Sequence, residues 1–190
     1  RRWHTRDRVA KNGQPARWDG QILEQVVNRI QELAPSVKTD WSQRTMVTIA
    51  AGKSGTPSFF QALTTHEWII TLKFFLPHNA FKPEVLDRQL RLTPFHEGPN
   101  PVLSDSRRLV VTKSRGKGQE VVITCHAAAD LETEGFQSFL ASAVRTYQQS
   151  FGTKQEKTKG SNSWAADGAT IQKRLKLLPK RKGRGVKSGE

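Results

Sequence analysis

Apolar and polar residues alternate along the chain with two periods, one helical and one extended. Between Trp18 and Pro35, apolar residues recur every three or four positions, which predicts a core-facing helix that Pro35 ends. Asp19 is placed to accept hydrogen bonds from the first-turn N–H groups of this helix. A second long helix is predicted over 130–151, where three acidic residues precede an apolar stripe. That stripe consists of Phe136, Phe139, Leu140, Val144 and Tyr147.

Short β-like runs fill most of the sequence between these helices. They cover residues 45–51, 58–64, 67–76, 108–113 and 119–125. Short turn segments connect several of these runs, which favours antiparallel pairing, and residues 36–40 are expected to form a turn. A short helix is expected after Pro83, and the proline-rich segment 93–106 is expected to be a surface loop. We therefore predict an α+β fold, in which an antiparallel sheet of about five strands is flanked by an N-terminal and a C-terminal helix.

Positive charge is concentrated at the two ends of the chain. The formal net charge is +14, yet residues 19–151 are almost neutral, with fourteen basic and thirteen acidic side chains. Residues 1–18 carry six basic side chains against one acidic, and residues 152–190 carry eleven against three. We therefore divide the chain into a basic N-terminal lead (1–18), an α+β domain (19–151) and a flexible, disordered basic tail (152–190). Cationic ends bind polyphosphates without a shaped pocket, although aiding solubility is an alternative role.

The tail ends in a basic amphipathic segment. Ile171, Leu175 and Leu178 lie on one side of a predicted short helix, with basic residues around them. Such a segment can bind nucleic acid, an acidic membrane surface or an acidic groove of a protein, and the sequence does not separate these partners. For nucleic acid, we assign phosphate contacts to Lys173, Arg174, Lys176, Lys180, Arg181, Lys182, Arg184 and Lys187.

No arrangement of residues in the sequence matches a known catalytic or metal-binding pattern. The tripeptide GKS at 52–54 has the end of a phosphate-binding loop, but Val47 replaces the first glycine of that motif. The five histidines lack metal-ligand spacing, and Cys125 and His126 face opposite ways on a strand. As the single cysteine, Cys125 is expected to be a buried apolar residue. We therefore predict no catalytic residue, no cofactor and no metal site.

The five tryptophans are a further source of contacts. In single-strand binders, exposed aromatic side chains stack on bases. Trp18 precedes the first helix and Trp68 lies in an apolar run, so both are expected to pack in the core. Trp3 and Trp164 lie in polar, cationic segments and are the better candidates for stacking.

Several residues together form a pattern that resembles a known accessory domain. They are Trp3-His4, Trp18-Asp19 with Leu23, the ELAP stretch at 32–35, Trp41, Val47 and the FQSFLASAV stretch at 136–144. The pattern is similar to the C-terminal accessory domain of some UvrA-like excinuclease ABC proteins, the damage-recognition ATPases of bacterial nucleotide excision repair. This resemblance spans residues 1–151 and implies a module that accompanies a repair ATPase. It implies no catalytic residues, because the ATPase motifs and zinc-binding cysteines of that family have no counterparts here.

These observations favour a non-enzymatic, DNA-associated accessory module: a compact body held by flexible cationic ends on nucleic acid, DNA rather than RNA. The alternative is a protein-interaction adaptor whose basic tail docks an acidic partner. A third hypothesis is an enzyme with an unrecognised site around His96 and Glu97. Because the sequence has no membrane-length apolar run and no signal peptide, we expect a cytoplasmic protein without a membrane partner. The first residue, Arg1, is not methionine, so we expect a fragment, a processed product or a domain of a longer protein.

Overall fold

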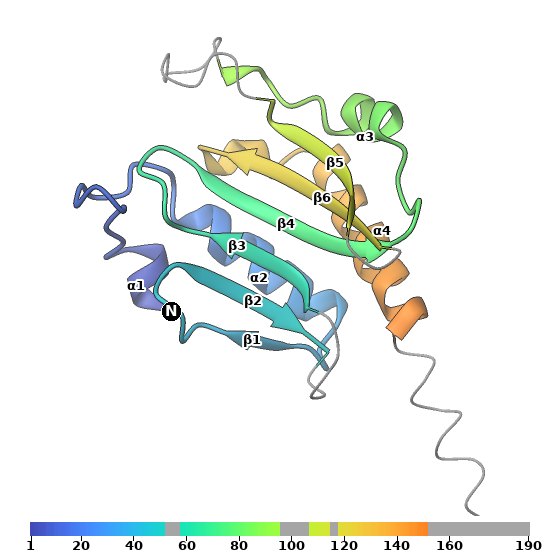
Figure 1. Cartoon of the computed structure of the whole chain (residues 1–190), viewed down its shortest axis with the longest axis horizontal. Helices are drawn as coiled ribbons and strands as arrows, with labels where there is room; N and C mark the ends of the chain where they lie inside the picture. The colour runs from blue at the N-terminus through green and yellow to red at the C-terminus, as the bar shows by residue number, and fades with distance from the viewer. Residues whose placement is uncertain (52–57, 96–106, 115–117, 152–190) are drawn as a thin grey trace, which may run out of the picture. The chain divides into compact units, whose positions relative to one another are not determined.

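The computed structural model describes residues 1–51, 58–95, 107–114 and 118–151, which belong to a compact unit spanning Arg1–Thr153 (Figure 1). In these ranges the helices are α1 (Arg2–Thr5), α2 (Gln21–Leu33), α3 (Pro83–Leu90) and α4 (Glu134–Phe151), with a 3₁₀ helix, η3, at Ala128–Asp130. The strands are β1 (Lys38–Asp40), β2 (Met46–Ala50), β3 (Ser58–Leu63), β4 (Ile70–Pro77), β5 (Leu109–Ser114) and β6 (Gly118–Cys125).

All six of these strands form one antiparallel sheet in the order β1-β2-β3-β4-β6-β5. The five predicted strands are confirmed as β2 to β6, although β4 begins at Ile70 rather than at residue 67. The predicted α+β fold with an antiparallel sheet is therefore confirmed. The additional strand, β1, lies within residues 36–40, for which we predicted a turn. It has three residues, Lys-Thr-Asp, without apolar alternation, so pairing with β2 decides its conformation.

One face of the sheet is covered by α2 and α4 (Figure 1). Strand register aligns Ile49, Phe60 and Phe74 across β2, β3 and β4, and Phe74 is aligned with Val121 of β6. All four side chains are buried, and they share one core cluster with residues of both helices. Phe74 packs edge-on against Phe139 of α4 with ring centroids 5.1 Å apart, which adds about 0.5–1.5 kcal/mol beyond area burial.

The start of α2 depends on residues that precede it. Trp18 is only 5% exposed, and its Nε1 donates a hydrogen bond to the carbonyl oxygen of His66 at 3.2 Å. This anchoring confirms that Trp18 packs in the core, and α2 begins after it, at Gln21. The carboxylate of Asp19 accepts a hydrogen bond from the N–H of Gln21 at 2.8 Å, which confirms that Asp19 accepts from a first-turn N–H group, although Gly20 occupies the N-cap position.

The apolar stripe predicted for the C-terminal helix is confirmed, because all five of its residues are buried in α4. The helix begins at Glu134 rather than at Asp130, since Asp130 belongs to η3 and has other partners. Its carboxylate accepts a hydrogen bond from the N–H of His126 at 3.0 Å. Thr133 takes the capping position instead, and its hydroxyl accepts a hydrogen bond from the N–H of Phe136 at 3.2 Å.

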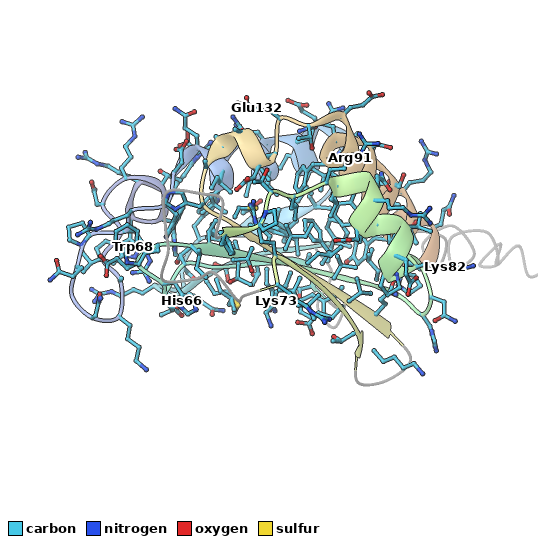
Figure 2. All side chains as sticks on the ribbon, turned by 90° about the horizontal axis from the view of Figure 1, so that it is seen from above. His66, Trp68, Lys73, Lys82, Arg91 and Glu132 are labelled. Atoms are coloured by element: carbon cyan, nitrogen blue, oxygen red, sulfur yellow. The ribbon has the colours of Figure 1, made fainter. Side chains whose placement is uncertain are left out.

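The other face of the sheet carries partly exposed polar and apolar side chains. Lys73 of β4 lies on this face, on the side away from α2 and from Glu132 (Figure 2). Its Nζ is 2.9 Å from Oε1 of Glu120 on β6, and both side chains are partly exposed. An ion pair with this exposure contributes about 0–1 kcal/mol, so it adds little to the stability of the sheet.

Candidate nucleic-acid interface

The eight cations assigned to phosphate contacts all lie beyond residue 151, outside the described part of the chain. Trp164, the tripeptide at 52–54, His96 and Glu97 also lie outside the residues that the structure describes. Of the two cationic ends, the structure therefore describes only the N-terminal one.

Residues 1–18 are folded against one end of the sheet, which differs from the flexible end that we expected. Helix α1 and the segment after it lie beside the end at which β2 and β4 begin and β3 ends (Figure 1). The N–H of Lys11 donates to the carbonyl oxygen of Thr65 at 3.1 Å, and the N–H of Arg17 donates to that of Glu67 at 2.6 Å. These backbone bonds attach the lead to the loop between β3 and β4.

A buried histidine holds α1 in place. The Nδ1 atom of His4 lies within hydrogen-bonding distance of Thr64 Oγ1, at 3.3 Å, and both residues are buried. The His4 ring also packs near the indole of Trp41, with centroids 6.0 Å apart. Burial lowers the pKa of His4, partly offset by backbone groups of Trp41 and Gln43, while the charge of Arg8 lowers it further. Burial thus favours the neutral imidazole in the folded chain.

Among the described residues, four arginine–tryptophan contacts lie at this end of the domain. The guanidinium carbon lies 5.8 Å from the indole centroid for Arg1 and Trp41, 6.0 Å for Arg8 and Trp3, 5.8 Å for Arg44 and Trp3, and 4.4 Å for Arg17 and Trp68. We call these seven residues the arginine–tryptophan end. Each contact of this kind contributes about 0.5–1 kcal/mol at exposed sites.

The tryptophans of this end differ in exposure. Trp3 is 37% exposed, whereas Trp41 and Trp68 are each partly buried. Core packing of Trp68, which we expected, is thus only partial, because this residue precedes β4 and lies under Arg17. The Nε1 of Trp3 donates a hydrogen bond to the carbonyl oxygen of Arg44 at 3.2 Å. The most exposed indole in the described part of the chain is therefore held against the turn before β2.

The cations of residues 1–18 and the nearby Arg44 are only partly neutralised. Three of them form ion pairs: Arg1 with Glu24 at 3.8 Å, Arg2 with Asp7 at 3.0 Å, and Arg17 with Glu67 at 2.9 Å. Arg6, Lys11 and Arg44 are exposed and have no ion pair with any residue that the structure describes. This end therefore combines an exposed indole with unpaired positive charge, the two features used to bind single-stranded nucleic acid.

Cys125 does not provide a reactive thiol. Its side chain is 0% exposed, and burial raises its pKa to about 12, so the thiol stays protonated at neutral pH. The prediction that it is a buried apolar residue is confirmed. The neighbouring His126 uses its Nδ1–H to donate a hydrogen bond to the carbonyl oxygen of Trp68 at 2.6 Å. Both side chains thus serve the packing between β6 and the loop before β4.

Arg108 is a buried cation that the sequence did not single out. Its Nη2 lies 2.5 Å from the carboxylate of Asp130, while Nε and Nη1 donate to the carbonyl oxygens of Thr124 at 3.1 Å and Thr93 at 2.7 Å. The guanidinium carbon lies 4.6 Å from the ring centroid of Phe95. All these partners belong to the domain itself, so Arg108 joins β5, β6, η3 and the segment after α3. A lone arginine beside a strand carries no sequence pattern that indicates this role.

Within the described ranges, no group of three or more histidine, cysteine, aspartate or glutamate side chains is arranged to hold a metal ion. The helices in these ranges include none with the length and apolar character needed to cross a membrane. No protein-family model matches the chain, and no match was found among curated proteins or among solved structures.

Proposed function

We propose that this chain is a non-enzymatic, DNA-associated accessory module that binds nucleic acid through its cationic ends. The arginine–tryptophan end is the observation that carries the proposal, because Arg44, which is exposed and has no ion pair with a described residue, lies there beside the exposed indole of Trp3. Arg6 and Lys11 of the N-terminal lead add exposed, unpaired positive charge at the same end of the domain. The tail cations from Lys173 to Lys187 would add phosphate contacts without sequence selectivity. In keeping with its resemblance to accessory domains of UvrA-like excinuclease ABC proteins, we place the module in cytoplasmic nucleotide excision repair, as a detached or C-terminal part of such a protein beside a repair ATPase.

Counterion release predicts how strongly the binding affinity should depend on the salt concentration. Each phosphate that a protein cation neutralises on duplex DNA steepens the dependence of log K on log salt by about 0.9. The three exposed, unpaired cations Arg6, Lys11 and Arg44 would therefore contribute about 2 to 3 to this slope. The eight assigned tail cations would contribute at most about 7.

Filter binding of the full chain to duplex DNA across a salt series tests the proposal. An end variant removes the three cations just named, through Arg6→Gln, Lys11→Gln and Arg44→Gln. A matched α3 variant removes three other exposed cations, through Lys82→Gln, Arg88→Gln and Arg91→Gln. Figure 2 shows that Lys82 and Arg91 lie away from the end that carries Trp68.

The two variants change the net charge equally, so they separate a local interface from a general charge effect. We expect the end variant to reduce the magnitude of the slope of log K against log salt by about 2 to 3. The α3 variant should leave this slope near the wild-type value. A wild-type slope near zero would remove the proposed function. A protein complex of fixed stoichiometry that survives nuclease treatment would support the adaptor alternative instead.

A further inference from the structure

The Trp3 indole differs from the other indoles of the described residues in being both exposed and fixed. Its Nε1–H bond to the carbonyl oxygen of Arg44 anchors one edge of the ring, while 37% of the residue faces solvent. Fixing an aromatic ring before binding lowers the entropy lost when a partner stacks on it.

Neither of the two arginines beside Trp3 forms a close stack on its ring. The guanidinium carbons of Arg8 and Arg44 lie 6.0 Å and 5.8 Å from its centroid, near the outer limit of a cation–π contact. By comparison, Arg17 lies 4.4 Å from the centroid of the partly buried Trp68. A planar base can therefore approach Trp3 without displacing a close stack, and exposed Arg44 is near enough to contact an adjoining phosphate.

We propose that Trp3 is a base-stacking platform that makes the arginine–tryptophan end selective for unpaired bases, so that single-stranded DNA binds there in preference to intact duplex. This inference rests on the proposed function and narrows its substrate. In a duplex, neighbouring bases cover both faces of each base, so a stack on Trp3 forms only where a base is unpaired or at a strand end. Phosphate contacts from the surrounding cations do not distinguish the two substrates in this way.

Equilibrium binding of the full chain to two fluorescently labelled probes at one salt concentration tests this selectivity. The probes are an oligothymidylate and a duplex of the same length whose two ends are closed by non-nucleotide linkers, so that no strand end is open. The variants are Trp3→Ala, which removes the ring, and Trp3→Phe, which keeps a ring without the Nε1 donor. Stacking of one base on an aromatic side chain predicts a loss of about 5- to 150-fold in single-strand affinity for Trp3→Ala, with duplex affinity nearly unchanged. Trp3→Phe should retain part of the single-strand preference.

The ratio of the two affinities separates stacking from a structural role. If Trp3→Ala lowered both affinities equally, Trp3 would only support the fold of this end and the inference would be overturned. It would also be overturned if Trp3→Ala changed neither affinity, or if Trp3→Phe lost as much of the preference as Trp3→Ala. Absence of binding to both probes by the wild-type chain would instead remove the proposed function itself.

Discussion

Replacement of Gly20 by alanine tests how α1 is held against α2. Gly20 has helical backbone angles, φ −63° and ψ −20°, which alanine adopts without strain. Space, not conformation, selects glycine here: a Cβ at this position would overlap the carbonyl oxygen of Thr5 and lie 2.8 Å from its carbonyl carbon. Because the obstacle is backbone, a side-chain rotation cannot relieve it.

Two opposing terms set the magnitude for Gly20→Ala. At a position with compatible backbone angles, this substitution stabilises a protein by about 0.4–1 kcal/mol, because it restricts the unfolded chain. Overpacking against a fixed neighbour costs about 1–3 kcal/mol. We therefore expect a net loss of about 1–2 kcal/mol in the free energy of unfolding, which lowers Tm by roughly 3–6 °C for a domain of this size.

Urea unfolding followed by circular dichroism measures the loss, and hydrogen exchange shows where it occurs. We expect faster exchange of amides in α1 and in the segment after it, because relief of the overlap moves these residues away from α2. Gln21→Ala is the matched control, since Gln21 is exposed and adjacent, and it should leave stability almost unchanged. A Gly20→Ala chain with wild-type stability and wild-type exchange in α1 would refute this account of the contact.

Three further predictions concern titratable groups in the domain. Because burial lowers the pKa of His4, its contribution to stability is fully present above the unfolded-state pKa of about 6.5 and is lost as the pH falls from there toward the lower folded-state pKa. His4→Phe should remove this part of the pH dependence in urea titrations, and an identical pH profile for both proteins would contradict it. Cys125 should resist iodoacetamide in the native chain at about pH 8 and react once urea exposes it, because burial raises its pKa to about 12; rapid native labelling would show that the thiol is accessible. Asp130→Ala should destabilise the domain by about 3–5 kcal/mol in urea unfolding, since it leaves the buried Arg108 charge without its partner; a loss below about 1 kcal/mol would mean that this pair behaves like an exposed one.

Much of the fold follows from the sequence because the period of the apolar residues records which side of each element is buried. The stripe from Phe136 to Tyr147 predicts α4, and alternation in the strand runs predicts the face that α2 and α4 cover. The roles of Trp18 and Cys125 also follow, since each is an apolar residue beside or within such a run. Local patterns suffice for these features because the residues that define them lie within a few positions of one another.

Other features depend on partners that are distant along the chain. Strand β1 forms through its pairing with β2. Asp130 lies outside α4 because its carboxylate pairs with Arg108 and accepts a hydrogen bond from the N–H of His126. The folded conformation of residues 1–18 depends on backbone hydrogen bonds such as that from Lys11 to Thr65. No local pattern contains these pairings.

Some features of the candidate interface likewise follow from the sequence, whereas others depend on the tertiary structure. The cationic ends and the choice of Trp3 as a stacking candidate came from composition and sequence position alone. Only the tertiary structure brings Arg44 of the turn before β2 to Trp3 of α1, and Arg17 to Trp68. Charge and polarity are properties of a residue and can be read from the sequence, whereas a contact between two side chains depends on where the folded backbone places them.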